Sequence, residues 1–375
     1  MRIAYIYPTI ATKGGVERIL VDKMNMLAQC VGYEVLLITY NQGDHPVSFP
    51  LNPQVRHVDL KVRTHQKYYF KAPRRWWEGF KRRHWLYTRL RRQIKAFSAD
   101  VLVTTTSDEL SLLMRLKGKT PLVVESHGGF EHLIDYPRLT WRHRWDISSR
   151  YRLLKHVDAI VALTARDAER WQSDYPRVRT IPNVVHLNPT GTISTGNSRR
   201  IIFVGRLAEQ KGISELAAIW QQISIKHPGW QLDVYGEGPQ SNLLQSLERL
   251  CVHTPVDDIF ERYVESSILV VTSRWEPFGL VIPEAMSCGL PVVSFEGDGP
   301  CSIITDGDDG FLVEKGHIAQ FVERVSLLIE DRELRQRMGR QAVQKAQRFS
   351  ADLIVSQWKE LFESLINSER NVKLV

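Results

Sequence analysis

Four charged residues in the second half of the sequence follow apolar runs at spacings that suit ligand binding. Arg206 and Lys211 come directly after one such run, in the segment GRLAEQKG. Glu276 and Glu284 follow another run and are separated by seven residues. Two cations can neutralise a diphosphate through charge-assisted hydrogen bonds, whereas two carboxylates repel an anion and suit hydroxyl groups. Each residue alone is most often a solvated surface charge, so the prediction of a ligand with phosphate and hydroxyl groups depends on their conjunction.

Glycines accompany these charges where a backbone would have to approach a ligand closely. Gly279 lies near the start of a predicted helix, where the helix dipole favours negative charge and no side chain blocks a phosphate. Gly14 and Gly15 lie between the first apolar run and the amphipathic segment 16–28. They would bring backbone amides to an anion, but a tight turn that needs a positive φ is the simpler explanation for them alone.

Short β-branched runs alternate with helix-length amphipathic segments along the chain, which is typical of α/β sheets. Residues 186–200 interrupt this pattern with a linker-like composition rich in Gly, Pro, Ser, Thr and Asn. We therefore predict two Rossmann-like, doubly wound domains that face each other across a cleft, residues 1–187 and 188–350, followed by a helical segment, 351–375. Helices are expected at 16–28, 151–156, 213–226, 279–288, 317–330 and 349–368. Open sheets of this kind bind ligands at the carboxyl ends of their strands.

The composition is that of a globular protein with a local excess of positive charge. The 375 residues carry a net charge of +8, and the segment from Lys61 to Lys95 alone holds 13 basic residues and one acid. The rest of the chain therefore has a net charge of −4, which favours a local anionic partner over polycation behaviour. Four separated cysteines show no zinc spacing and suit a reducing compartment. No apolar run approaches the roughly 18 residues that span a bilayer, and the N-terminus lacks a signal-peptide pattern, so we expect a cytoplasmic protein.

Residues 67–95 interleave cations with aromatic side chains. Cations beside tryptophan suit an anionic lipid surface, where the indole lies at headgroup depth. The phosphate backbone of a nucleic acid, or a solvated helix whose aromatic residues belong to the core, are the competing interpretations. The residues predicted for this basic aromatic surface are Arg74, Arg75, Trp76, Trp77, Lys81, Arg82, Arg83 and Trp85, with Trp141, Arg142, Arg144 and Trp145 as an extension. The residues expected on one helical face are Trp77, Phe80, Tyr87, Leu90 and Ile94.

Six short motifs keep a fixed order along nearly the whole chain. They are Gly14-Gly15-Val16-Glu17-Arg18, Ser126-His127-Gly128, Ile181-Pro182-Asn183, Phe203-Val204-Gly205-Arg206 with Lys211-Gly212, Tyr235-Gly236-Glu237-Gly238-Pro239, and the segment from Glu276 to Glu284. In this order they resemble glycosyltransferase family 4, whose members have the GT-B fold. The resemblance implies transfer of a sugar from a nucleotide-sugar donor, with retention of the anomeric configuration and without a metal or other cofactor. It also implies that the last helix crosses back onto the N-terminal domain.

The resemblance gives each motif residue an expected role. Arg206 and Lys211 would bind the donor diphosphate, Glu284 the ribose hydroxyls and Glu276 the transferred sugar. His127 would face the reacting centre, with a solvated loop histidine as the alternative. The leaving phosphate can take the acceptor proton, so we expect positioning and electrostatic roles rather than a protein nucleophile. The expected donor-binding residues are Gly14, Gly15, Arg206, Lys211, Phe278, Gly279, Leu280 and Glu284, and the expected catalytic residues are His127, Glu276, Arg206 and Lys211.

Two segments depart from the family pattern or imitate another one. The helix expected after Gly238 is short here, and residues 252–256 contain no glycine for a loop that contacts the nucleobase, so the base of the donor stays open. Asp306-Gly307-Asp308 is expected to be a plain turn rather than a metal-binding Asp-x-Asp motif.

The combined hypothesis is a retaining glycosyltransferase that moves a hexose-type sugar to a lipid-linked or surface-polysaccharide acceptor. Its expected partners are a UDP-sugar or another nucleotide sugar, a glycan acceptor and the anionic inner face of the cell membrane, with no nucleic acid. One rival is a soluble transferase that makes a small glycoside and does not bind liposomes. The other rival is a non-catalytic α/β protein that binds nucleic acid in a salt-sensitive way.

Overall fold

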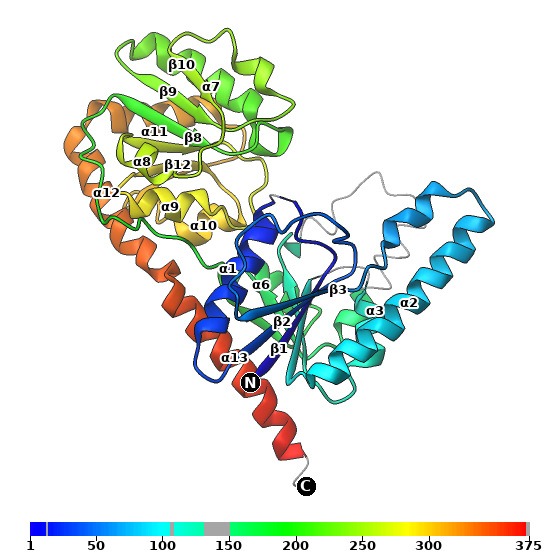
Figure 1. The fold of residues 1–375 in the computed structure, drawn as a ribbon. Coiled ribbons are helices and arrows are strands. Elements are labelled where there is room, and N and C mark those ends of the chain that lie inside the picture. Colours follow the sequence, from blue (N-terminus) through cyan, green and yellow to red (C-terminus); the bar gives the residue numbers. More distant parts are fainter. Residues whose placement is uncertain (13, 106–108, 131–150, 373–375) are drawn as a thin grey trace. The chain divides into compact units, whose positions relative to one another are not determined.

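The protein is described by a computed structural model that covers residues 1–12, 14–105, 109–130 and 151–372 (Figure 1). These residues form two compact units. The first comprises Met1–Val184 together with Ile354–Val375, and the second comprises Val185–Leu353. The division at residue 184 lies within three residues of the boundary expected at 187.

The first unit contains a seven-stranded sheet with the order β3-β2-β1-β4-β5-β6-β7, in which every strand pair is parallel. Its inner strands are near-continuous apolar runs because helices cover both faces of a parallel sheet. The strands are β1 (Arg2–Tyr7), β2 (Glu34–Thr39), β3 (Val55–Asp59), β4 (Val101–Thr105), β5 (Leu122–Ser126), β6 (Ala159–Ala162) and β7 (Val178–Thr180).

Alternate residues of β1 show the two covered faces of the first sheet. Ala4 and Ile6 join a core cluster with Leu90 of the helix 74–97, whereas Tyr5 lies on the other face, where its ring centroid is 5.3 Å from Lys23 Nζ of the helix 15–29. The helices whose bounds lie within the described residues of this unit include α1 (Gly15–Gln29), the 3-10 helix η1 (Thr64–Tyr69), α2 (Arg74–Phe97), α3 (Leu110–Leu116), α6 (Ala165–Gln172) and α13 (Ala351–Val372). All but the first residues of α13 belong to the first unit.

The second unit contains a six-stranded parallel sheet with the order β10-β9-β8-β11-β12-β13. The strands are β8 (Arg200–Val204), β9 (Gln231–Tyr235), β10 (Leu250–His253), β11 (Ile268–Val271), β12 (Val292–Phe295) and β13 (Gly310–Val313). The α-helices are α7 (Ile213–Lys226), α8 (Phe260–Val264), α9 (Val281–Ser287), α10 (Asp298–Ile303), α11 (Ile318–Glu330) and α12 (Arg332–Ala346), and the 3-10 helices are η2 (Glu209–Lys211), η3 (Ser241–Leu244) and η4 (Gln347–Phe349). Two doubly wound α/β sheets confirm the predicted fold class.

The observed helix bounds agree with the predicted ones where the amphipathic segment is long. They differ where a turn sets the end of the helix. The bounds of α7 match the prediction, and those of α1 and α11 differ from it by one residue. The predicted helix 279–288 is shorter, because Gly279 and Leu280 remain in the loop and Ser287 ends α9. The highly charged helix α12 was not predicted, since its buried stripe consists mainly of small residues.

In each sheet, the chain adds strands first toward one edge and then toward the other, and the change occurs between two neighbouring strands. In the second unit these strands are β8 and β11, where Ile201 and Ile202 pair with Ile268 and Leu269. In the first unit they are β1 and β4. The loops that leave such a pair diverge to opposite sides, and the crevice between them is where open α/β sheets hold ligands.

Gly212 connects η2 to α7 at a position where the backbone leaves no room for a side chain. Its φ is +65°, and a Cβ atom built on it would lie 1.9 Å from the carbonyl oxygen of Thr272. The close approach brings the loop after β8 against the end of β11. Gly191 has a similar φ of +69° but no atom within 4 Å of a built Cβ.

Gly212→Ala is therefore expected to destabilise the protein more than Gly191→Ala. The left-handed backbone costs alanine about 1 kcal/mol at either position, after the gain from a stiffer unfolded chain. Gly212→Ala adds a steric cost of ~1–3 kcal/mol because the Thr272 carbonyl must move. The midpoints of urea unfolding measure the difference, and equal midpoints for the two variants would contradict the close approach.

Candidate functional site

Two oppositely charged side chains meet at the carboxyl ends of β8 and β11. Lys211 ends η2, which follows β8, and Glu276 lies in the loop after β11. The Lys211 ammonium group forms a direct ion pair with Glu276 Oε2. The pair is partly buried, with side-chain exposures of 20% and 10%. Strand pairing thus joins a cation and a carboxylate that are 65 residues apart in the sequence.

Neighbouring polar groups fix the two loops that carry this pair. Thr272 Oγ1 donates to the Lys211 carbonyl at 2.9 Å, and Ser273 Oγ donates to Glu276 Oε2 at 3.1 Å. The Arg274 guanidinium donates to Glu215 and Glu209 at 2.7 and 2.9 Å, and this attachment to carboxylates raises its pKa. Thr272, Ser273 and Arg274 were not among the predicted site residues, although they lie within four residues of Glu276.

Arg206 has an exposed side chain for which the structure records no hydrogen bond or ion pair among the described residues. Its loop is nevertheless well fixed, because Leu207 N donates to the Glu237 carbonyl at 2.8 Å. A Cβ atom built on Gly236 would lie 1.9 Å from the Gly205 carbonyl oxygen, so the loop after β9 packs directly on the Arg206 loop. A fixed loop with an uncommitted guanidinium is suited to an anionic ligand.

The remaining predicted residues of the second unit lie around Glu276. Phe278 is buried, and its ring packs edge-on against Phe349, with the two ring centroids 5.6 Å apart. The Glu276 carbonyl accepts a hydrogen bond of 3.0 Å from the Gly299 amide, which fixes the loop backbone. Glu284 is buried in the first turn of α9. The loop residues Phe278, Gly279 and Leu280 and the helical Glu284 therefore belong to one packed segment with Glu276.

His127 and the two early glycines lie at strand ends of the first unit. His127 directly follows β5 and has a side chain only 6% exposed, so the alternative of a solvated loop histidine is wrong. Gly14 caps α1 with an extended φ of −95°, and neither Gly14 nor Gly15 has a positive φ. A tight turn therefore does not explain these glycines. Gly15 is exposed, and a built Cβ meets no atom within 4 Å.

The basic aromatic stretch divides into an exposed half and a packed half. Trp76, Trp77 and Phe80 are 70%, 66% and 68% exposed. Arg74 lies 4.4 Å from the Phe70 ring centroid, so cations and aromatic rings interleave on this surface. Figure 1 shows the beginning of α2 extending away from the strands of its own sheet. The packed residues further along the helix are Leu86, Leu90, Ile94 and Phe97. Among the described helices, none has the length and apolar content required to cross a bilayer.

The predicted stretch is one helix, but it packs on the core only in part. Trp77, Phe80, Tyr87, Leu90 and Ile94 all belong to α2, and only the last three pack on the core. One prediction for this stretch needs correction. Arg82 does not belong to the exposed surface. Its side chain is 12% exposed, donates to the Val62 carbonyl at 2.7 Å and lies 3.6 Å from Glu78. The rest of the predicted set differs in exposure. Arg74, Arg75 and Arg83 are exposed, Arg83 donates to Ser111, and Lys81 and Trp85 are half-buried. Trp141, Arg142, Arg144 and Trp145 lie outside the described residues.

Two aspartates near the beginning of β13 accept hydrogen bonds from the backbone. Asp306 Oδ1 accepts from Leu312 N and Asp309 Oδ1 accepts from Thr305 N, both at 2.9 Å. The segment around Asp306 is therefore the predicted plain turn. Within the ranges that the structure describes, no three His, Cys, Asp or Glu side chains are grouped so that they could hold a metal ion.

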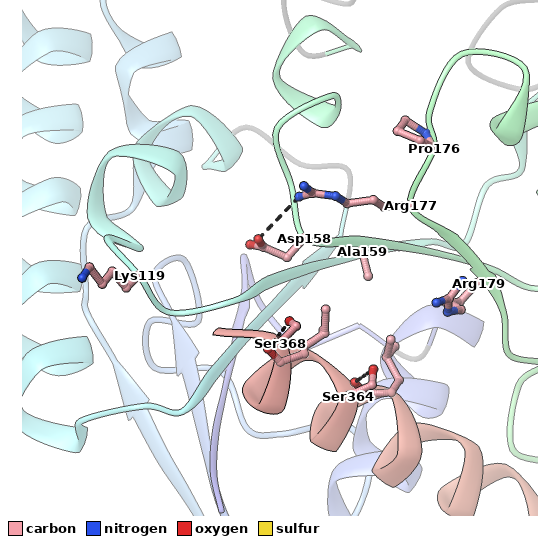
Figure 2. Close-up of a pocket in the computed structure, with 10 residues that line it drawn as sticks. Lys119, Asp158, Ala159, Pro176, Arg177, Arg179, Ser364 and Ser368 are labelled. Carbon is pink, nitrogen blue, oxygen red and sulfur yellow. Dashed lines mark hydrogen bonds and ion pairs between the residues drawn. The ribbon is translucent and has the colours of Figure 1, made fainter. Parts of the chain in front are cut away.

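A cavity of about 900 Å³ lies at the amino-end edge of the first sheet (Figure 2). Asp158 and Arg177 directly precede β6 and β7. At this edge of the sheet Arg177 Nη1 lies 3.8 Å from Asp158 Oδ1. Ser364 and Ser368 of α13 line its other side (Figure 2). None of the predicted site residues lines this cavity, so it is separate from the strand ends that carry His127.

Two family models together match most of the chain. Residues 13–188 match the model described as Glycosyltransferase Family 4, and residues 192–345 match the model described as Glycosyl transferases group 1. The chain belongs to glycosyltransferase family 4. Each family model covers one of the two sheets almost completely, which agrees with the two-sheet fold.

Relatives and a solved structure extend this comparison. An exopolysaccharide phosphotransferase of Streptomyces coelicolor is 29% identical over 74% of this chain, but the chain spans only 30% of that longer protein. An N-acetylgalactosaminyltransferase of Campylobacter jejuni, named for an undecaprenol-diphosphate-linked acceptor, is 23% identical over 98% of this chain and 100% of its own length. The structure of HepE from Anabaena in complex with UDP has a TM-score of 0.74 at 18% identity, covering 97% and 100% of the two chains. The GT-B fold of this glycosyltransferase agrees with that structural likeness.

In this glycosyltransferase, the helix α9 is followed directly by Cys288, whose thiol can be used to test how tightly α9 packs. Cys288 is fully buried, and burial raises the pKa of its thiol to about 12. Because this pKa is raised, the thiol stays protonated and unreactive at pH 8. We expect a disulfide reagent to modify the exposed Cys251 quickly at pH 8 and Cys288 only after denaturant is added. Cys251→Ser is the control, and rapid loss of the Cys288 thiol in native buffer would show that α9 opens.

Proposed function

We propose that this glycosyltransferase moves a hexose-type sugar from a nucleotide diphosphate sugar to a glycan acceptor, with retention of configuration and without a metal. The observation that carries the proposal is the partly buried Lys211–Glu276 ion pair, together with the exposed guanidinium of Arg206, which has no recorded partner among the described residues. This arrangement offers two cations to a diphosphate and a carboxylate to sugar hydroxyls within one pair of loops.

Charge neutralisation is the first catalytic task of these loops. As the bond between sugar and phosphate breaks, negative charge accumulates on the leaving diphosphate. Arg206 and Lys211 stabilise this charge through hydrogen bonds, and fixed loops make them effective because little reorganisation is needed. The two side chains thus supply the positive charge of the proposed metal-independent mechanism.

Glu276 has two partners in succession under this proposal. Without a ligand its carboxylate pairs with Lys211. When the donor binds, the diphosphate takes Lys211, and the carboxylate accepts hydrogen bonds from hydroxyls of the transferred sugar. The loop amides of Phe278, Gly279 and Leu280 lie beside the same sugar. The buried carboxylate thus has a partner both without a ligand and with the donor bound. A buried charge without a partner would be costly.

The other predicted residues complete the donor site. Glu284 accepts from the ribose hydroxyls of the donor, and the backbone at Gly14 and the exposed Gly15 approaches its phosphates. His127 hydrogen-bonds a hydroxyl of the sugar that reacts. The leaving phosphate takes the proton of the acceptor hydroxyl on the same face of the sugar, so the sugar keeps its anomeric configuration and the mechanism needs no protein nucleophile.

The proposed donor is a UDP-sugar, and the proposed acceptor is a lipid-linked or surface-polysaccharide glycan. The UDP bound in the HepE structure supports the choice of donor, and the undecaprenol-diphosphate-linked acceptor in the name of the Campylobacter relative supports the choice of acceptor. An acceptor anchored in the membrane requires the enzyme to reach the bilayer surface, where an exposed basic and aromatic patch is favourable.

The exposed half of α2, with η1 beside it, is the proposed docking surface for the anionic inner face of the cell membrane. Lys71, Arg74 and Arg75 supply exposed positive charge, and Trp76 and Trp77 supply exposed indoles. Each cation near an anionic bilayer contributes about 1 kcal/mol. Exposed tryptophans gain further free energy at headgroup depth, which a solvated helix in water cannot provide.

The two members of the ion pair are expected to have opposite effects on nucleotide binding. Glu276→Gln removes the charge that competes for Lys211, so UDP should bind about tenfold more tightly. The same variant should lose transfer on the order of 100-fold, because the sugar hydroxyls lose their acceptor. Lys211→Met should weaken UDP binding about tenfold and also lose transfer. Calorimetric titration with UDP, GDP and ADP measures affinity and identifies the base.

Lys226→Met is the matched control for the ion pair, because Lys226 lies 3.3 Å from Glu330 in an exposed pair of the same unit. It should change neither UDP affinity nor transfer. The proposed roles would be contradicted if Glu276→Gln and Lys211→Met both retained full transfer.

Neutralising the docking surface is expected to weaken membrane binding without affecting donor hydrolysis. The triple variant Lys71→Gln/Arg74→Gln/Arg75→Gln removes about 3 kcal/mol of attraction, so binding to anionic phosphatidylglycerol vesicles at low salt should fall on the order of 100-fold. Sedimentation with vesicles measures the effect, and purely zwitterionic vesicles provide the baseline.

A variant with the same loss of charge elsewhere separates a specific surface from net charge. Arg332→Gln/Arg337→Gln/Arg340→Gln neutralises three exposed cations of α12. It should bind anionic vesicles like the wild-type protein. Equal weakening by both triple variants would remove the docking surface from the proposal and favour a transferase that acts on a small acceptor in solution.

A further inference from the structure

The first unit buries a complete ion pair between its first helix and the middle of its sheet. Lys23 of α1 and Glu125 of β5 are each 2% exposed, and the Lys23 ammonium group is hydrogen-bonded to Glu125 Oε2. The ring centroid of Trp358 in α13 lies 4.1 Å from the same Lys23 Nζ. Three elements that are distant in the sequence therefore meet at one buried charge.

A buried ion pair is costly for stability. Two charges lose their hydration, and their mutual attraction often only offsets that loss, so apolar residues of the same volume would serve the fold as well. The direct contact between the ammonium group and the carboxylate favours the charged forms, against burial, which lowers the pKa of Lys23. Burial raises the pKa of Glu125, but the nearby charge of Lys23, together with His127, outweighs it and lowers that pKa below the ordinary value. The carboxylate is thus maintained in an apolar layer, which points to a use beyond packing.

His127 is the other neighbour of this carboxylate. It lies two residues after Glu125, and side chains two residues apart in a strand share a face of the sheet. His127 Nε2 is 3.2 Å from Glu125 Oε2. Both ring nitrogens of His127 and Oε1 of Glu125 are buried without a hydrogen-bond partner among the described residues. A small rotation of the ring would therefore let Nε2 donate to the carboxylate.

We propose that Glu125 and Lys23 are positioning residues for His127. Glu125 accepts from Nε2–H, which fixes the ring and its tautomer. Lys23 keeps Glu125 ionised at that place, and Trp358 of α13 packs over Lys23. This inference rests on the role of His127 in the proposed function, and it adds two residues and the C-terminal helix to that role.

The test replaces the ion pair in two ways that differ only in the acceptor offered to His127. Lys23→Met/Glu125→Leu makes the pair apolar and removes the acceptor. Lys23→Met/Glu125→Gln also removes both charges but keeps an oxygen near Nε2. Both double variants avoid an uncompensated buried charge, so their melting temperatures should stay near that of the wild-type protein. Lys117→Met is the control, because Lys117 pairs with Asp158 at 2.8 Å at the opposite edge of the same sheet.

The first readout is a long-range ¹H–¹⁵N correlation spectrum of the histidine rings, with His127 assigned from His127→Ala. The wild-type spectrum should show His127 protonated at Nε2. The signals should change in the leucine variant and remain close to wild type in the glutamine variant and in Lys117→Met. Unchanged His127 signals in the folded leucine variant would overturn the inference, whatever the activity.

The second readout is steady-state transfer. The leucine variant should lose at least about tenfold in kcat, with the donor KM within about twofold, and the glutamine variant should recover most of that loss. Full transfer by the leucine variant alongside an inactive His127→Ala would also overturn the inference. If the His127 signals change but His127→Ala transfers normally, the positioning by Glu125 stands and the role of His127 in the proposed function fails.

Discussion

Parallel pairing of β8 with β11 is the constraint on which the second unit depends. It brings together two loops that are about 65 residues apart, and with them Lys211 and Glu276. The approach of the two loops also depends on Gly212. Because this residue has no side chain, the loop after β8 can lie against the end of β11. The charge arrangement of the candidate site is therefore a property of strand order, and the local sequence only supplies the side chains.

The sequence was sufficient for those parts of the fold that depend on local pattern. Apolar runs and amphipathic segments predicted two α/β sheets and the helices α1, α7 and α11 closely, because burial sets their periodicity. The order of motifs was sufficient for the family. The buried Lys23–Glu125 pair was missed because a lysine in an amphipathic helix and a glutamate in a strand each look ordinary. Their contact depends on how α1 packs on the sheet, which no local pattern encodes.

The α2 helix shows how one pattern can serve two purposes. Its leucine, isoleucine and phenylalanine residues from Leu86 onward pack on the sheet, whereas Trp76, Trp77 and Phe80 at its beginning are exposed. The helical period is the same in both halves, so periodicity alone could not separate them. The difference arises because the packed half lies over the sheet and the first half extends beyond it (Figure 1).

The return of the chain to the first unit has a consequence for synthesis on the ribosome. Domains usually fold as units while the chain emerges, N-terminal domain first. Here Trp358, which covers the buried ammonium group of Lys23, is translated more than 300 residues after it. The first sheet must therefore wait, with one face incompletely covered, until the second unit has been made and α13 has followed it.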